Sequence, residues 1–171
     1  MELWDILTAD GAHTGRTMVR GGTALKSGEY HLVVHIWPIN DYGSILIQKR
    51  TKTKRLMPGI WAATGGAAIA GEDSFTAASR ELAEELGIAS DETSLQFVTR
   101  MKRKNSFVDI WTIRANVCVP DLTLQKSEVA QAKWVNAATL KSMVANGEFH
   151  NYGNDYFEYV WRCSKQMKTK E

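Results

Sequence analysis

The stretch from Gly65 to Ile88, GGAAIAGEDSFTAASRELAEELGI, constrains the fold of this chain more than any other. It opens with glycines and small residues, and then places four glutamates and an arginine within fourteen positions. Asp73 and Ser74 are both good N-caps, and Gly87 is typical of the position just past a helix C-terminus. We therefore predict a helix between them that carries an unusual concentration of negative charge.

The predicted helix has one apolar stripe and one acidic flank. At 3.6 residues per turn, the residues that can pack on a sheet are Phe75, Ala78, Leu82 and Leu86. The carboxylates beside this stripe are those of Glu81, Glu84 and Glu85. Like charges at this spacing weaken a helix by a few tenths of a kcal/mol per pair, which a cation would offset. Arg80 can pair with Glu84 or reach back to Glu72. Charge alone leaves two interpretations, a solvated acidic face and a magnesium site.

The spacing of the charged residues decides between these interpretations. Gly66, five residues, Glu72, seven residues and then RELAEELGI at positions 80–88 match G-x5-E-x7-R-E-U-x-E-E-x-G-U, where U is aliphatic. This signature is the Nudix box, and the chain resembles Nudix hydrolases over most of its length. The resemblance implies hydrolysis of a diphosphate linkage by water, typically in a nucleoside diphosphate joined to another group.

The resemblance also implies a divalent metal, Mg²⁺ or alternatively Mn²⁺. Phosphoryl transfer needs neutralised diphosphate oxygens and a positioned water, and metal ions provide both. The metal ligands implied are Glu81, Glu84 and Glu85, with Glu72 as a further ligand. The same three glutamates, with Arg80 and Glu128, are the catalytic residues expected. Glu128 lies in KSEVAQAKWV, where the family often has an acidic residue that acts as base or ligand; a surface glutamate is the alternative.

A narrower resemblance concerns substrate binding. EYHLVVHIWPIN, LIQKRTKTKRLMPGIW and the N-terminal segment resemble type I isopentenyl-diphosphate isomerases. In those enzymes an Arg and a Lys four residues later bind the diphosphate, ahead of a Pro-Gly-x-Trp turn, and Arg50, Lys54 and Trp61 match that spacing. The substrate-binding residues expected are Arg50, Lys54, Trp61, Gly65 and Gly66. For the basic residues, the alternative is a solvated loop without a ligand. His31 matches a metal-binding histidine of the isomerases, and its alternative role is that of a strand residue packed in the fold.

The segment after Trp61 separates hydrolase from isomerase. The isomerases carry a catalytic cysteine and a metal-binding histidine there, whereas AATGGAAIAGE contains neither residue type. Cys118 and Cys163 cannot replace the cysteine by position. We therefore predict a hydrolase and leave isomerase-like activity as a disfavoured alternative. A non-catalytic nucleotide-sensing domain is the other alternative, against which the intact box argues.

The order of predicted elements indicates an α+β fold, an α/β/α sandwich with a mixed central sheet and an N-terminal β-hairpin. Strands are expected at 31–39, 44–50, 94–103, 107–119 and 132–135, and helices at 74–86, 137–147 and 155–167. We predict one domain over 1–171, with the hairpin and a loop in 1–29, the core in 30–150, and a C-terminal helix and tail in 151–171. The apolar face of the last helix is expected to pack on the sheet, with a substrate lid or a homodimer contact as alternatives.

Composition excludes several function classes. The formal net charge of +2 is too small to indicate a nucleic-acid partner. No apolar segment approaches the ~18 residues needed to span a bilayer, and the N-terminus does not resemble a signal peptide. Two cysteines make no disulfide framework, and both are expected to be buried. We predict a cytoplasmic protein whose partner is a small-molecule diphosphate.

Overall fold

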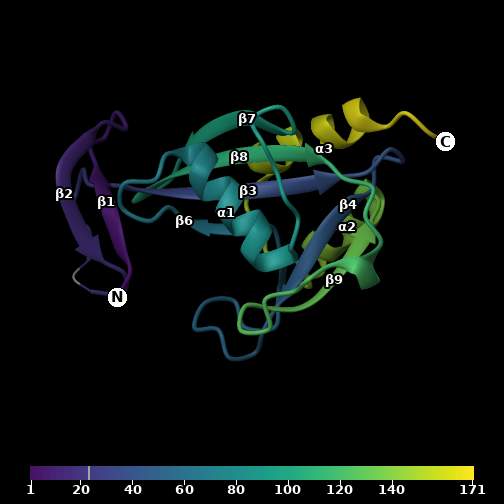
Figure 1. The fold of residues 1–171 in the computed structure, drawn as a ribbon, viewed down its shortest axis with the longest axis horizontal. Coiled ribbons are helices and arrows are strands. Elements are labelled where there is room, and N and C mark those ends of the chain that lie inside the picture. The colour runs from purple at the N-terminus through teal and green to yellow at the C-terminus, as the bar shows by residue number, and fades with distance from the viewer. Residues whose placement is uncertain (23) are drawn as a thin grey trace.

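The computed structural model describes residues 1–22 and 24–171. Figure 1 shows an elongated mixed α+β molecule in which a separate hairpin lies at one end of a central sheet. The strands are β1 Leu3–Leu7, β2 His13–Val19, β3 His31–Ile39, β4 Ile45–Arg50, β5 Trp61–Ala62, β6 Thr64–Ala67, β7 Leu95–Lys102, β8 Ser106–Arg114 and β9 Val129–Val135. The helices are α1 Ser74–Leu86, α2 Ala137–Ala145 and α3 Asn154–Met167, with a 3₁₀ turn, η1, at Val119–Asp121.

The central sheet is mixed. Its main path runs β5-β4-β3-β8-β7, with β6 also paired to β3 and β9 to β4. Strands β3 and β8 are parallel, with His31 opposite Ser106 and Ile39 opposite Arg114, and the other pairs are antiparallel. The hairpin of β1 and β2 forms a two-stranded sheet of its own. The predicted fold class, a mixed sheet with an N-terminal hairpin, is confirmed.

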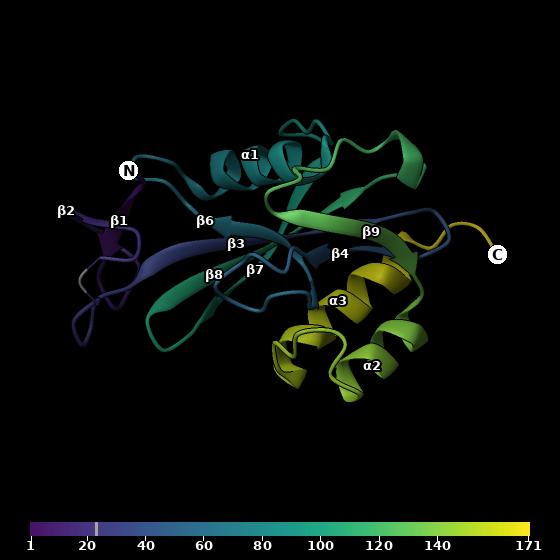
Figure 2. The same ribbon diagram turned by 90° about the horizontal axis from the view of Figure 1, so that it is seen from below.

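Strand β3 shows why helices cover both faces of the sheet. Alternate side chains of a strand point to opposite faces. Val34 and Ile36 pack in the core beneath α1, whereas Trp37 and Ile39 pack in the core beneath α2 and α3. Figure 2 shows α1 on one side of the sheet and the other two helices on the opposite side.

Helix α1 has the limits that the sequence predicts. The Asp73 side chain accepts a hydrogen bond from the Thr76 N–H, and Gly87 closes the helix in the left-handed conformation, at φ 70°. Ala78, Leu82 and Leu86 of the predicted stripe are fully buried, and Phe75 is partly buried. The helix therefore turns its flank toward β6 and β4, where Glu85 accepts hydrogen bonds from Gly65 and Gln48.

Several expectations about local structure were wrong. The short strands β5 and β6 lie in the segment at 61–67, for which no strand was predicted. Strand β9 begins at Val129, three residues before the expected strand. Strand β8 ends at Arg114, and the chain then enters η1, where Pro120 cannot donate to a sheet. Cys163 is buried as expected, but Cys118 is exposed.

Helix α3 packs its apolar face on the sheet, as predicted. Its buried side chains are Tyr156, Phe157, Val160, Cys163, Ser164 and Met167. That face is therefore used within the chain and does not argue for a homodimer. Within residues 1–22 and 24–171, no helix has the length and apolar character needed to cross a membrane.

Candidate functional site

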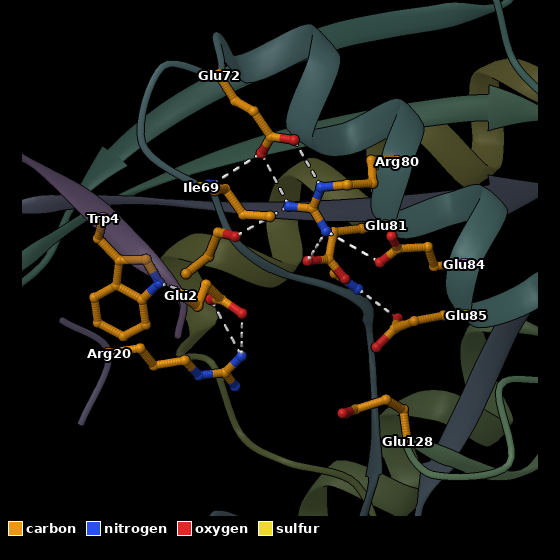
Figure 3. Close-up of polar contacts among 12 residues, drawn as sticks. Glu2, Trp4, Arg20, Ile69, Glu72, Arg80, Glu81, Glu84, Glu85 and Glu128 are labelled. Carbon is orange, nitrogen blue, oxygen red and sulfur yellow. Dashed lines mark hydrogen bonds and ion pairs between the residues drawn. The ribbon is translucent and has the colours of Figure 1, made fainter.

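One cavity of about 370 Å³ joins the acidic flank of α1 to the hairpin. Its floor is formed by β3 and β6, and the loop after β4 and residues near β9 complete it. The charged side chains that line it are Glu2, Arg20, Arg50, Lys54, Arg80, Glu81, Glu84, Glu85 and Glu128. Figure 3 shows α1 presenting its glutamates on one side and the hairpin presenting Glu2, Trp4 and Arg20 on the other.

Arg80 organises three of the carboxylates. Its Nε and Nη2 donate to the two carboxylate oxygens of Glu72, at 2.7 and 2.9 Å. Its Nη1 donates to Glu81 Oε1 at 2.9 Å and to Glu84 Oε2 at 3.2 Å. Burial alone would raise the pKa of Glu72, but hydrogen bonds from Arg80 and from the Ile69 N–H hold that pKa below its usual value. Arg80 thus pairs with both glutamates that the sequence suggested, Glu72 and Glu84, and also with Glu81.

The Glu85 carboxylate accepts hydrogen bonds from donors other than Arg80. The Gln48 side chain donates to its Oε2 at 2.8 Å, and the Gly65 N–H donates to the same oxygen at 2.9 Å. Only 3% of Glu85 is exposed, and burial, together with the nearby charge of Glu81, raises its pKa to about 8. The second oxygen, Oε1, receives neither of these hydrogen bonds and is the one left for a ligand.

Gln48 is a site residue that the sequence analysis missed. It lies in β4 among Ile45, Leu46 and Ile47, and it is only 1% exposed. A polar residue in a buried strand is rare without a partner, and this was the signal that could have identified it.

The two glycines before α1 allow close contacts of two kinds. A Cβ on Gly65 would lie 2.0 Å from the Val34 carbonyl oxygen, and Gly65 has φ of 144°. A Cβ on Gly66 would lie 2.6 Å from Glu81 Oε1. Gly65 is therefore required by the backbone of β3, whereas Gly66 leaves room for the Glu81 carboxylate.

The carboxylates fit a divalent cation by their chemistry. Burial raises the pKa of Glu81, against the influence of Arg80, so Glu81 and Glu85 are both carboxylates whose negative charge is destabilised. A hard cation with oxygen ligands would offset that cost. Within the described part of the chain, no three acidic, histidine or cysteine side chains lie together in a way that could hold a metal ion. Arg80 holds Glu81 and Glu84. Metal binding would require those carboxylates to turn from Arg80.

The predicted basic residues line the cavity, and Lys54 forms an ion pair with Glu128. The Thr51 N–H also donates to the Glu128 carbonyl oxygen at 3.0 Å, which ties the loop after β4 to the start of β9. Arg50 donates through Nε to the Leu56 carbonyl oxygen at 3.0 Å. The structure thus joins the expected phosphate-binding lysine to the expected acidic residue.

Trp61 lies outside the cavity, whereas His31 is packed at the start of β3, in agreement with its alternative as a strand residue. Trp61 is not among the residues that line the cavity; it is buried, and the ammonium groups of Lys49 and Lys133 lie over its ring. His31 lines the cavity at the hairpin end, where its ring stacks on Trp4 with 4.4 Å between ring centroids. Burial lowers its pKa to about 4. Trp4 and Arg20 were not identified from the sequence, because their place depends on how the hairpin docks.

Comparisons with known proteins agree with this geometry. A family model described as NUDIX domain matches residues 29–157. The chain is 42% identical to an uncharacterized Nudix hydrolase of Listeria monocytogenes over 153 residues, covering 89% of this chain and 90% of that protein. It is 29% identical to an isopentenyl-diphosphate Delta-isomerase of Brevibacterium linens over 128 residues, covering 70% of this chain and 69% of that protein. A crystal structure from Deinococcus radiodurans superposes with a TM-score of 0.79 at 24% identity, covering 95% of this chain and 99% of that chain.

Proposed function

Since the chain belongs to the Nudix hydrolase family, we propose that it hydrolyses a diphosphate linkage in a nucleoside diphosphate derivative or a related organic pyrophosphate. The observation that supports this most is the placement of Glu81, Glu84 and Glu85 in one cavity with Arg50 and Lys54. Carboxylates for a cation and cations for a diphosphate are the two parts that phosphoryl transfer to water requires.

We assign the residues of this cavity the following roles. Glu81, Glu84 and Glu85 would hold Mg²⁺, with Glu72 as a supporting residue, and the ion would neutralise diphosphate charge and make the attacking water more acidic. Gln48 and the Gly65 N–H orient Glu85. Arg80 orients Glu72 through two hydrogen bonds.

Substrate binding falls to the basic loop. Arg50 and Lys54 would bind the diphosphate oxygens, since a guanidinium and an ammonium both suit phosphate. When Lys54 turns to the diphosphate, Glu128 loses its partner and is free to accept a proton from water.

The isomerase alternative lacks the cysteine and the histidine that those enzymes carry after the tryptophan. Protonation of an alkene requires a well-placed proton donor, and the segment at 62–67 presents only alanine and glycine to the cavity. Neither Cys118 nor Cys163 lines it. Hydrolysis needs only groups that are present. The proposed cofactor is Mg²⁺ or Mn²⁺. A cytoplasmic location also stays a proposal.

The test is Glu84→Gln, which removes one charge from the carboxylate cluster with little change in shape. We expect turnover to fall on the order of 10²-fold or more, the usual cost of losing a preorganised electrostatic group. Phosphate release would be measured over a Mg²⁺ titration with nucleotide sugars, dinucleotides and nucleoside triphosphates. Glu92→Gln, which changes an exposed glutamate after α1, is the matched control.

Two outcomes would contradict the proposal. Full activity of Glu84→Gln at limiting Mg²⁺ would remove Glu84 from the reaction. Tight binding by the unaltered protein without turnover across the whole panel would favour a nucleotide-sensing domain.

A further inference from the structure

The hairpin of β1 and β2 contributes a second group of side chains to the cavity, away from the carboxylates. Trp4 and Glu2 come from β1 and the residue before it, and Arg20 directly follows β2. In Figure 3 these three side chains lie across the cavity from Glu84 and Glu85. We propose that Trp4 and Arg20 form the subsite for the nucleobase of a nucleoside diphosphate substrate. This proposal rests on the function proposed above and narrows its substrate class.

The hairpin is docked firmly enough to act as a binding wall. The Leu7 N–H donates to the Tyr30 carbonyl oxygen at 2.7 Å, which fixes the hairpin to the start of β3. The Ala70 N–H donates to the Leu3 carbonyl oxygen at 2.8 Å, and the Gly71 N–H donates to Asp5 Oδ2 at the same distance. These contacts fall in the loop that leads to Glu72 and α1. The hairpin is therefore positioned relative to the carboxylates.

The side chains of this wall are already ordered by one another. The Trp4 indole N–H donates to Glu2 Oε1 at 2.9 Å, and Arg20 Nη1 donates to both Glu2 oxygens, at 3.2 and 3.1 Å. The Arg20 guanidinium lies over the Trp4 ring, 6.0 Å from its centroid. The Arg20 backbone N–H donates to the Glu2 carbonyl oxygen at 3.0 Å. Within residues 1–22 and 24–171, the guanidinium N–H groups on Nε and Nη2 of Arg20 make no hydrogen bond.

This chemistry suits a nucleobase better than an isoprenoid chain. The His31 ring stacks on Trp4 and the Arg20 guanidinium lies over the Trp4 ring, so Trp4 holds Arg20 in place and the guanidinium is the plane on which a base would stack. A base also offers carbonyl or ring nitrogen acceptors for the remaining guanidinium donors of Arg20. An apolar chain would instead cover the Glu2–Arg20 ion pair and desolvate it without compensation. The cavity volume of about 370 Å³ lies within the usual range for pockets that bind small organic molecules.

The experiment measures binding with probes that cannot be hydrolysed. Nucleoside 5′-methylenediphosphonates of the four common bases, in which CH₂ replaces the bridging oxygen, are titrated by calorimetry with Mg²⁺. Methylenediphosphonate is the probe without a base. The proteins compared are the unaltered chain, Trp4→Leu, Arg20→Gln and the matched control Arg16→Gln. Arg16 lies on the same hairpin and pairs with Glu29 on the surface, at 2.6 Å, with an exposure close to that of Arg20.

We expect at least one nucleoside probe to bind the unaltered chain about tenfold or more tightly than methylenediphosphonate. Trp4→Leu and Arg20→Gln should each weaken that nucleoside probe about tenfold and leave methylenediphosphonate binding unchanged. Arg16→Gln should change neither. Should Trp4→Leu fail to fold, Arg20→Gln alone still decides, because it replaces an exposed side chain.

Two results would overturn the subsite. One is equal affinity for the nucleoside probes and methylenediphosphonate; the other is an equal loss for both kinds of probe in Arg20→Gln. Failure of the proposed hydrolysis has a different signature. Tight binding of a nucleoside probe that responds to Trp4 and Arg20, without turnover of any natural diphosphate, would support the subsite and refute the reaction.

Discussion

The two ends of the cavity are built by different means. At the α1 end, Glu85 is 3% exposed and bonded to Gln48 and Gly65, and the backbone of β6 lies against β3 with no space for a side chain on Gly65. At the hairpin end, Trp4 and Arg20 are ordered by a surface ion pair on a two-stranded sheet outside the central one.

This difference separates two kinds of sensitivity. A change at the α1 end disturbs buried groups, so it should alter stability or turnover for every substrate. A change at the hairpin end disturbs groups that are partly or fully exposed, so the fold should tolerate it while selectivity changes.

Gly65→Ala should have the largest effect. Its Cβ would lie 2.0 Å from a backbone oxygen, at a φ that L-residues rarely adopt, so β6 would have to leave β3. We expect the free energy of unfolding in urea to fall by about 4 kcal/mol or more. Gly66→Ala is the matched control, because its Cβ meets only the Glu81 carboxylate; it should lose less than about 1 kcal/mol while turnover drops. Similar unfolding free energies for both variants would contradict the different roles given to Gly65 and Gly66.

Low pH should destabilise the fold through His35, a residue of β3 that contacts Tyr156 of α3. Its Nδ1 lies 2.8 Å from the Tyr156 hydroxyl, and burial lowers its pKa to about 3. Below pH 6.5 the unfolded chain takes up a proton that the folded chain refuses until about pH 3. Unfolding free energy should therefore fall by up to ~1.4 kcal/mol per pH unit across that window.

The comparison that isolates His35 is His35→Asn. At pH 8 both proteins have a neutral side chain, so their difference gives the cost of the lost contact with Tyr156. As the pH falls from 6.5 toward 4.5, that difference should shrink. A difference that stays constant with pH would show that His35 does not cause the acid sensitivity.

Gln48→Leu should weaken metal use without unfolding the chain. Leucine fills the same buried space, but Glu85 loses one of its two donors to Oε2. Loss of such an orienting contact usually costs 10–100-fold, or about 1.4–2.7 kcal/mol, and the Mg²⁺ concentration for half-maximal activity should rise accordingly. Gln131→Leu, an exposed position on neighbouring β9, is the control. Identical Mg²⁺ curves for both variants would exclude Gln48 from this role.

Glu2→Gln should have the smallest effect on stability. The Glu2–Arg20 pair is partly solvated, and surface ion pairs contribute about 0–1 kcal/mol. A glutamine oxygen can still accept from the Trp4 indole. We expect the free energy of unfolding, measured in urea, to change by less than about 1 kcal/mol. A loss of unfolding free energy as large as that of Gly65→Ala would show that the hairpin is part of the core. The two ends of the cavity would then not differ in their sensitivity to substitution.

Local signals made α1 predictable from the sequence. Its caps, Asp73 and Gly87, act within one turn, and the spacing of its charges identified the family. β5 and β6 were not predictable, because alanine and glycine have little strand preference and pairing with β4 and β3 defines them. The position of Trp61 beneath two lysines and the approach of the hairpin to the cavity also depend on tertiary packing, which a local pattern does not contain.

The contacts of Arg80 also limit where this chain can change length. Glu72 must reach the guanidinium from the loop between β6 and α1, while the Ile69 N–H holds the same carboxylate at 2.9 Å. One inserted residue would shift Glu72 by roughly 3–4 Å, more than a hydrogen bond can absorb. Insertions should therefore be rejected between residues 67 and 72 and accepted in the mostly exposed connection at 89–93. The five-residue interval in the motif is set by this reach.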